Sequence, residues 1–210
     1  HQQGLCVRVA DDADAALAGA MNQGRNSRDV YNSLQYDTLV SKPDMKVTEI
    51  DDTTRYEISA DSRKNIVNNA INNAKHIGTT DKNGGVLVYV DDIKESVLLS
   101  RKGLAHGLDR RMQDVAAVTE NAGKIIRNAI KINELTPDIE TAKDTYVLLG
   151  AAKNGNGDPY IVEFVVNKFD NSVESVDVLY SINTKKESAA LNAPESANKS
   201  LLITDSTISI

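Results

Sequence analysis

The clearest hydrophobic pattern in the first half of the chain is a helical repeat in residues 61–77 ("DSRKNIVNNAINNAKHI"). Apolar residues recur there at helical spacing, at Ile66, Ala70, Ala74 and Ile77. The opposite side is mostly asparagine, as expected of a face in contact with water. Asp61 or Ser62 is suited to cap the first turn, and Gly78 to end the helix. The pattern therefore predicts an amphipathic helix over residues 61–77.

The patterns typical of strands begin directly after this helix. Runs of β-branched and aromatic residues at 84–92 ("GGVLVYVDD") and 96–100 ("SVLLS") predict two strands joined by a turn at "DDIKE". Three further strand-like runs follow later in the chain, at 145–152, 160–169 and 172–182. The turn signals between these runs, "KNGNGDP" and "DN", predict an antiparallel meander.

Helical patterns also occur before and between the strands. Residues 10–23 and 26–39 predict two short helices, and Pro43 breaks the second pattern. Residues 115–130 carry the apolar face of another helix, which is interrupted near Thr119.

The order of these elements predicts the division of the chain and its fold class. We expect an N-terminal helical segment and linker over 1–42, an α+β domain over 43–187, and a polar tail with a strand-like end over 188–210. Helices followed by a meander predict an α+β fold, in which N-terminal helices and a short hairpin pack on a roughly four-stranded antiparallel sheet.

The composition of the 210 residues excludes several classes of protein. The hydrophobic fraction is 40% and the charged fraction 26%, which is ordinary for a globular domain. No apolar run approaches the roughly 20 residues of a membrane span, so no membrane partner is expected. The single cysteine, Cys6, cannot form an intramolecular disulfide. The three histidines, His1, His76 and His106, have no spacing typical of a metal site, so neither a metal nor a cofactor is predicted.

The charge distribution sets one segment apart from the rest of the chain. Residues 100–131 contain seven basic and three acidic residues, a net charge of +4, so the remainder carries −10 of the total of −6. A basic segment in an acidic protein is compatible with a local phosphate site. A pair of solvated helices explains the same charges without any ligand.

The stretch "LLSRKGLAHGLDRR" (98–111) combines this charge with an unusual pair of glycines. Ser100 is suited to cap a helix that starts at Arg101. Lys102 and His106 are four residues apart and therefore share a face of that helix. Glycines also stand four apart, at Gly103 and Gly107, where each costs about 1 kcal/mol relative to alanine. Close approach of another backbone, or of a ligand, is the usual reason for such glycines.

A lysine and a histidine on one face suit the cleavage of RNA by its own 2′-hydroxyl. That reaction needs a base for the 2′ proton, an acid for the 5′-oxygen and positive charge at the phosphate. Histidine is the side chain suited to acid–base work near neutral pH, and lysine or arginine stabilises phosphate charge without a metal. The alternative is that His106 is a structural histidine packed between helix and sheet.

The segments "SRKGLAHGLDRR", "ENAGKIIRNAIKINEL", "DTYVLLGAA", "PYIVEFVVNKFD" and "LYSINTKKE" resemble, in this order, one group of predicted nucleases. These are the phage-associated members of the barnase–EndoU–colicin–RelE superfamily, which occur in large polyvalent proteins and phage head-protein (MuF-type) fusions. The resemblance covers about residues 43–187. It implies helices packed on a four-stranded antiparallel sheet and a metal-independent ribonuclease activity, used as a toxin or effector.

The same resemblance implies roles for particular residues. His106 would be the general acid or base, and Lys102 and Arg101 would hold the scissile phosphate. Tyr180 and Thr184 match hydroxyls that line the site on a late strand, and the alternation of a strand places them on one face together with Ile182.

Ser100 and Arg127 are further candidates for phosphate binding. The β half of the chain lacks the second histidine of the two-histidine mechanism, so Lys102, Tyr180 or Thr184 has to replace it if the domain is active.

The leading hypothesis is therefore a metal-independent endoribonuclease-like domain of a phage or mobile-element polyprotein. The expected partners are RNA, with tRNA among the candidates, an immunity or antitoxin protein, and a larger parent polypeptide. The expected location is the cytoplasm, or delivery as part of a phage or effector protein. The alternatives are an inactive protein- or RNA-binding module of the same fold and a binder of small phosphate compounds.

Overall fold

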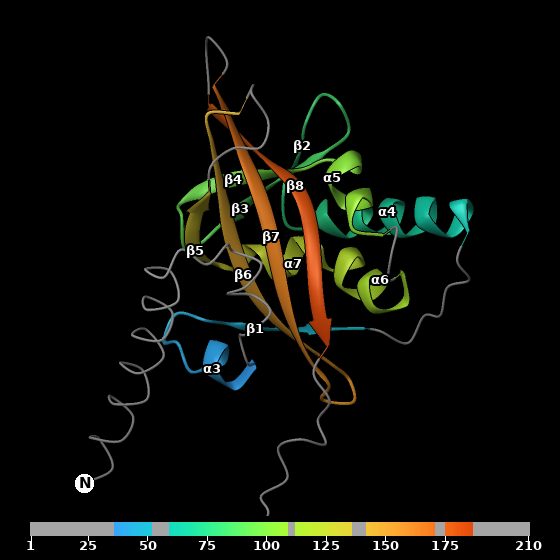
Figure 1. The fold of residues 1–210 in the computed structure, drawn as a ribbon. Helices are drawn as coiled ribbons and strands as arrows, with labels where there is room; N and C mark the ends of the chain where they lie inside the picture. The colour runs from blue at the N-terminus through green and yellow to red at the C-terminus, as the bar shows by residue number, and fades with distance from the viewer. Residues whose placement is uncertain (1–35, 52–58, 109–111, 136–141, 171–174, 187–210) are drawn as a thin grey trace, which may run out of the picture.

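A curled sheet that mixes parallel and antiparallel pairs is the main element of the fold (Figure 1). The computed structural model describes residues 36–51, 59–108, 112–135, 142–170 and 175–186, with 43% of them in strands and 31% in helices. Eight strands of this described part form one sheet in the order β1-β6-β7-β8-β4-β3-β2, with β5 paired to β6.

Three long antiparallel strands form the centre of the sheet, as the turn signals predict. They are β6 (Asp144–Asn154), β7 (Pro159–Asp170) and β8 (Ser175–Lys186). The turn between β6 and β7 is held by Asn154, whose side-chain oxygen accepts hydrogen bonds from the backbone N–H groups of Asn156 and Asp158 at 3.1 and 2.8 Å.

The predicted α+β fold, with a hairpin packed on a roughly four-stranded antiparallel meander, was wrong. The hairpin of β3 (Val86–Val90) and β4 (Glu95–Leu99) joins the sheet itself, because β4 pairs in parallel with β8. The short strand β2 (Thr79–Thr80) extends this side of the sheet. On the other side β1 (Val47–Ile50) pairs in parallel with β6, and β5 (Ile130–Leu135) pairs with it antiparallel.

Four helices cover one face of the sheet (Figure 1). They are α4 (Ala60–Ala74), α5 (Arg101–His106), α6 (Met112–Glu120) and α7 (Ala122–Arg127). The core between these helices and the sheet includes the buried side chains of Ile66, Ile71, Leu104, Ile125, Leu148 and Phe164. Burial of each large side chain contributes about 1.5–3 kcal/mol. This core fixes the helices, and therefore α5, against the strands.

The other face of the sheet is covered in part by α3 (Tyr36–Val40). Tyr36 and Leu39 are buried in a second cluster with Val147, Leu149 and Ile161. Both predicted N-terminal helices except residues 36–39, and the predicted tail over 188–210, lie outside the described residues. No helix in the part of the chain that the structure describes is long and apolar enough to cross a membrane.

Two of the predicted helices differ in their ends from the helices observed. The cap of α4 is Ser59, whose hydroxyl accepts a hydrogen bond from the Ser62 N–H at 3.0 Å, so neither predicted cap was right. The predicted helix over 115–130 is two helices broken at Asn121, whose side chain donates to the Ala117 carbonyl at 2.9 Å. Its last residue, Ile130, already belongs to β5 and pairs with Leu149.

Candidate functional site

Helix α5 lies directly against the backbone of β8, and its two glycines make this contact possible. A Cβ atom on Gly103 would lie 2.0 Å from the Leu179 carbonyl oxygen, and one on Gly107 would lie 2.3 Å from that of Ile182. Real Cβ atoms essentially never come this close to another heavy atom. The glycines are therefore explained by a neighbouring backbone, one of the two reasons that the sequence left open.

The start of α5 follows the prediction. Ser100 is its N-cap, and the Ser100 hydroxyl accepts a hydrogen bond from the Gly103 N–H at 3.1 Å. This bond satisfies one of the donors that a helix leaves unpaired in its first turn. The predicted phosphate-binding role of Ser100 thus stands beside a structural role that the same oxygen already fulfils.

His106 and Tyr180 come together where α5 crosses β8. Their ring centroids are 4.8 Å apart and the ring planes are tilted by 39°. His106 is exposed, so it is not a histidine packed between helix and sheet, and Tyr180 keeps 37% of its surface accessible. Lys102, one helical turn before His106, is also exposed. A ligand can therefore reach the imidazole, the phenol and the ammonium from the same side of α5.

A β-bulge places Tyr180 in this position. Val165 of β7 pairs with Ser181 and Val166 with Leu179, so Tyr180 is an extra residue on β8. The prediction that Tyr180 and Thr184 share a face with Ile182 was wrong, because the bulge interrupts the alternation of side chains. Ile182 is buried in the core, whereas Tyr180 faces outward against His106.

The other candidate residues lie at the margin of this site or away from it. Thr184 is four residues beyond Tyr180, roughly 13 Å along the strand, and its hydroxyl donates to the Ile161 carbonyl at 3.4 Å. Arg101 is exposed, and its guanidinium donates to the side-chain oxygen of Asn68 on α4 at 2.5 Å. Arg127 is not part of the site. Its carbonyl accepts from the N–H of Asp91, at the end of β4 opposite to α5.

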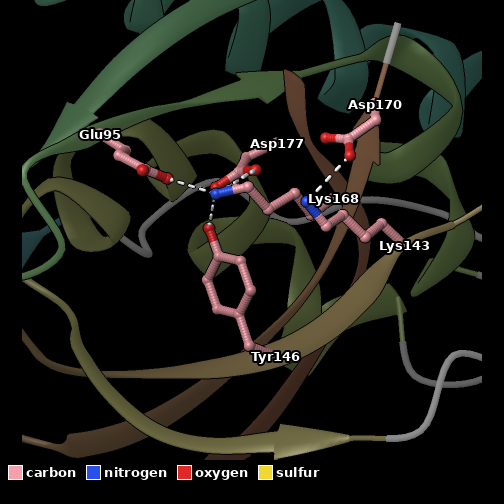
Figure 2. A network of polar contacts seen from close by, with 6 residues as sticks. All are labelled: Glu95, Lys143, Tyr146, Lys168, Asp170 and Asp177. Carbon is pink, nitrogen blue, oxygen red and sulfur yellow. Dashed lines mark hydrogen bonds and ion pairs between the residues drawn. The ribbon is translucent and has the colours of Figure 1, made fainter. Parts of the chain in front are cut away.

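A second group of polar side chains, which was not predicted from the sequence, lies at that opposite end of β4 (Figure 2). The Tyr146 hydroxyl donates to the Asp177 carboxylate at 2.6 Å. The Lys168 ammonium lies 3.1 Å from the Glu95 carboxylate and 3.9 Å from that of Asp177. A carboxyl group at an inward-facing strand position, as at Asp177, is the sequence signal that could have identified this group.

The surroundings of this second group shift the pKa values of its members in opposite directions. Asp177 is only 4% exposed, and its burial raises the pKa of its carboxyl above the usual range. The hydrogen bond from Lys168 lowers the pKa of Glu95, and the same bond raises the pKa of Lys168. Burial also raises the pKa of Tyr146 far above its usual value. Carboxyl groups with pKa values driven apart are typical of functional sites, although ion pairs with a structural role also produce them.

A cavity of about 340 Å³ opens beside this group. Its walls come from β4, β5, β6, β7 and the turn between β3 and β4, with polar side chains from Asp92, Glu95, Lys131, Asp144, Tyr146 and Lys168. Within the described ranges no group of three or more histidine, cysteine or acidic side chains is arranged to hold a metal ion.

Comparisons with protein-family models, with curated proteins and with solved structures find no match to this chain. The resemblance to phage-associated nuclease domains therefore stays a prediction.

Proposed function

We propose that the surface formed by α5 and β8 cleaves RNA without a metal ion, with His106 as the acid–base group. The observation that carries the proposal is the contact of the exposed His106 ring with the Tyr180 ring, at 4.8 Å. This contact joins two residues that are 74 positions apart in sequence, one on a helix and one on a strand, and it places an imidazole beside a phenol at a surface that solvent reaches.

In the proposed reaction the 2′-oxygen of a ribose attacks the adjacent phosphorus. The bond from the 2′-oxygen to phosphorus forms, and the bond from phosphorus to the 5′-oxygen breaks. The His106 imidazole takes the 2′ proton, and a proton has to reach the leaving 5′-oxygen. The Tyr180 hydroxyl is the neighbouring group that can donate it, and the Lys102 ammonium stabilises the added negative charge at phosphorus. The products are a 2′,3′-cyclic phosphate and a 5′-hydroxyl.

The experiment compares the wild-type chain with His106→Ala on a labelled RNA in the presence of EDTA. General acid–base catalysis contributes about 10²–10⁴-fold, so we expect His106→Ala to lose at least about 100-fold in rate. His76→Ala is the matched control, because His76 is also exposed but follows α4. A DNA strand of the same sequence should stay intact, since it lacks the 2′-hydroxyl. Equal cleavage by wild type and His106→Ala would refute the proposal.

A second candidate function is RNA binding without cleavage. The described residues include two histidines, His76 and His106, and they lie on different elements. The pair of histidines that the two-histidine mechanism uses is therefore not assembled among the described residues, which favours binding over cleavage. An exposed tyrosine beside an imidazole also suits the stacking of a base, which is worth about 1–3 kcal/mol.

Tyr180→Phe separates the two functions. Loss of the hydroxyl should slow cleavage if Tyr180 donates a proton, whereas a stacking role keeps its affinity because the ring remains. RNA that is bound by the wild-type chain and left intact would establish the second function.

A further inference from the structure

The cavity at the far end of β4 has walls of both charge signs, and this property distinguishes it from the basic surface of α5. We propose that it binds a small zwitterion of the amino-acid type, at a site independent of the proposed RNA site. Its volume of about 340 Å³ lies at the lower end of the range of small-molecule sites. A compact ligand is therefore expected.

The charges around the cavity select the class of ligand. Lys131 and Lys168 contribute ammonium groups, and Asp92, Glu95 and Asp144 contribute carboxylates. A ligand with only negative charge would face three carboxylates, and one with only positive charge would face two ammonium groups. A ligand that carries both charges can place each of them beside its opposite.

The structure suggests where each end of such a ligand would lie. Asp144 is exposed at the cavity wall, and its carboxylate interacts with Lys143 and Lys168 through charge alone, so it is suited to receive the ligand's ammonium group. Lys131, whose ammonium lies 5.0 Å from the centre of the Tyr146 ring, is suited to receive the carboxylate. The Tyr146 ring and the side chain of Ile93 supply the apolar surface between the two charges.

Polar contacts around the cavity hold its walls in place. Asp177 binds the Tyr146 hydroxyl at 2.6 Å and lies 3.9 Å from the Lys168 ammonium, which ties β6, β7 and β8 together. The Asp92 carboxylate accepts a hydrogen bond from the Lys131 N–H at 2.8 Å, which joins the turn after β3 to β5. Because these contacts are made without a ligand, a ligand has little to reorganise on binding.

The experiment measures binding by calorimetry to the full chain with three compounds of nearly equal shape. L-Leucine carries both charges, 4-methylpentanoate lacks the ammonium group, and 3-methylbutylamine lacks the carboxylate. Since one charge-assisted contact is worth about tenfold in affinity, we expect leucine to bind at least about tenfold more tightly than either analogue.

The Asp144→Asn variant locates the site. It should weaken leucine binding by about tenfold, since the neutral amide keeps the shape but loses the charge. Lys143→Gln is the matched control: Lys143 is the adjacent residue, but its ammonium pairs with Asp170 at 2.9 Å (Figure 2), and Lys143 is not among the residues that line the cavity.

Three results would overturn the proposal: an analogue that binds as tightly as leucine, no leucine binding at up to about 10 mM, or equal binding by Asp144→Asn and wild type. RNA cleavage by the Asp144→Asn variant is measured separately. It tests the proposed function of α5 and β8, and its result does not depend on whether the cavity binds leucine.

Discussion

Replacing Gly103 by alanine tests whether the contact between α5 and β8 is as close as the structure shows. The new Cβ would lie 2.0 Å from the Leu179 carbonyl oxygen and 2.9 Å from its carbonyl carbon. Ordinary contacts begin at 3.4 Å, so the helix or the strand has to move by about 1.4 Å. Both atoms belong to the backbone of β8, which is paired on its other side with β7. This pairing limits how far β8 can move.

Two effects of opposite sign determine how much Gly103→Ala changes the free energy of unfolding. Overpacking of a well-packed interface costs typically about 1–3 kcal/mol, and a clash with backbone belongs at the upper end of this range. Alanine also favours the helix over glycine by about 1 kcal/mol. We therefore expect Gly103→Ala to lower the free energy of unfolding by about 2 kcal/mol, the difference between these two effects.

The assay is equilibrium unfolding in urea, followed by circular dichroism, with two control variants. Ala105→Gly measures the helix-propensity effect within α5 itself, because Ala105 is exposed on the same helix. Gly155→Ala tests a glycine with no atom within 4 Å of a new Cβ, and it should change stability by less than about 0.5 kcal/mol. Gly103→Ala could instead stabilise the protein by as much as Ala105→Gly destabilises it. That result would mean that only helix propensity matters at residue 103, and it would refute the close contact between α5 and β8.

Three further predictions concern the helix cap and the buried polar group. Ser100→Ala removes the acceptor of the Gly103 N–H and should cost about 1 kcal/mol in urea unfolding, so an unchanged midpoint would contradict the capping role. Tyr146→Phe leaves the Asp177 carboxyl without its donor and should cost about 1–3 kcal/mol, and wild-type stability of this variant at neutral pH would show that water replaces the bond. Because the pKa of Asp177 is raised in the folded protein, its protonated carboxyl stabilises the fold. This contribution to stability is complete below the ordinary pKa of 3.8 and is lost as the pH rises through the pKa of the folded state. Asp177→Asn stays neutral, so its stability relative to wild type should increase as the pH rises from the ordinary value of 3.8 through the folded value, and a constant difference would show that burial does not perturb this group.

The features that sequence predicted correctly depend on neighbours in the chain. Ser100 caps α5 because a hydroxyl directly before the first helical turn can bond to the N–H three residues later. The β6–β7–β8 meander follows from turn residues between strand-like runs. The spacing of Gly103 and Gly107 predicted that something would approach α5 closely, although not what it would be.

The features that sequence did not predict depend on pairing across long distances. The parallel pairs β4–β8 and β1–β6 join segments that no local pattern relates, so the extent of the sheet was underestimated. The spacing of apolar residues allowed Ile130 to belong to a helix or to a strand, and its pairing with Leu149 of β6 places it in a strand. The register of β7 against β8, which opposes Lys168 to Asp177 and inserts the bulge at Tyr180, is likewise fixed by the sheet as a whole.

The position of His106 results from several independent features, and this makes its contact with Tyr180 more than a chance approach of two surface rings. The parallel pairing of β4 with β8 ends at Leu98 and Val178, so the chain enters α5 beside the next residues of β8. The two glycines then let α5 press against Leu179 and Ile182, on either side of Tyr180. A side chain at either glycine would move the helix away from the strand, and the bulge gives Tyr180 its outward direction. Gly103→Ala should therefore weaken any activity of His106 along with stability, whereas Ser100→Ala, which keeps the glycine contacts, should affect stability more than activity.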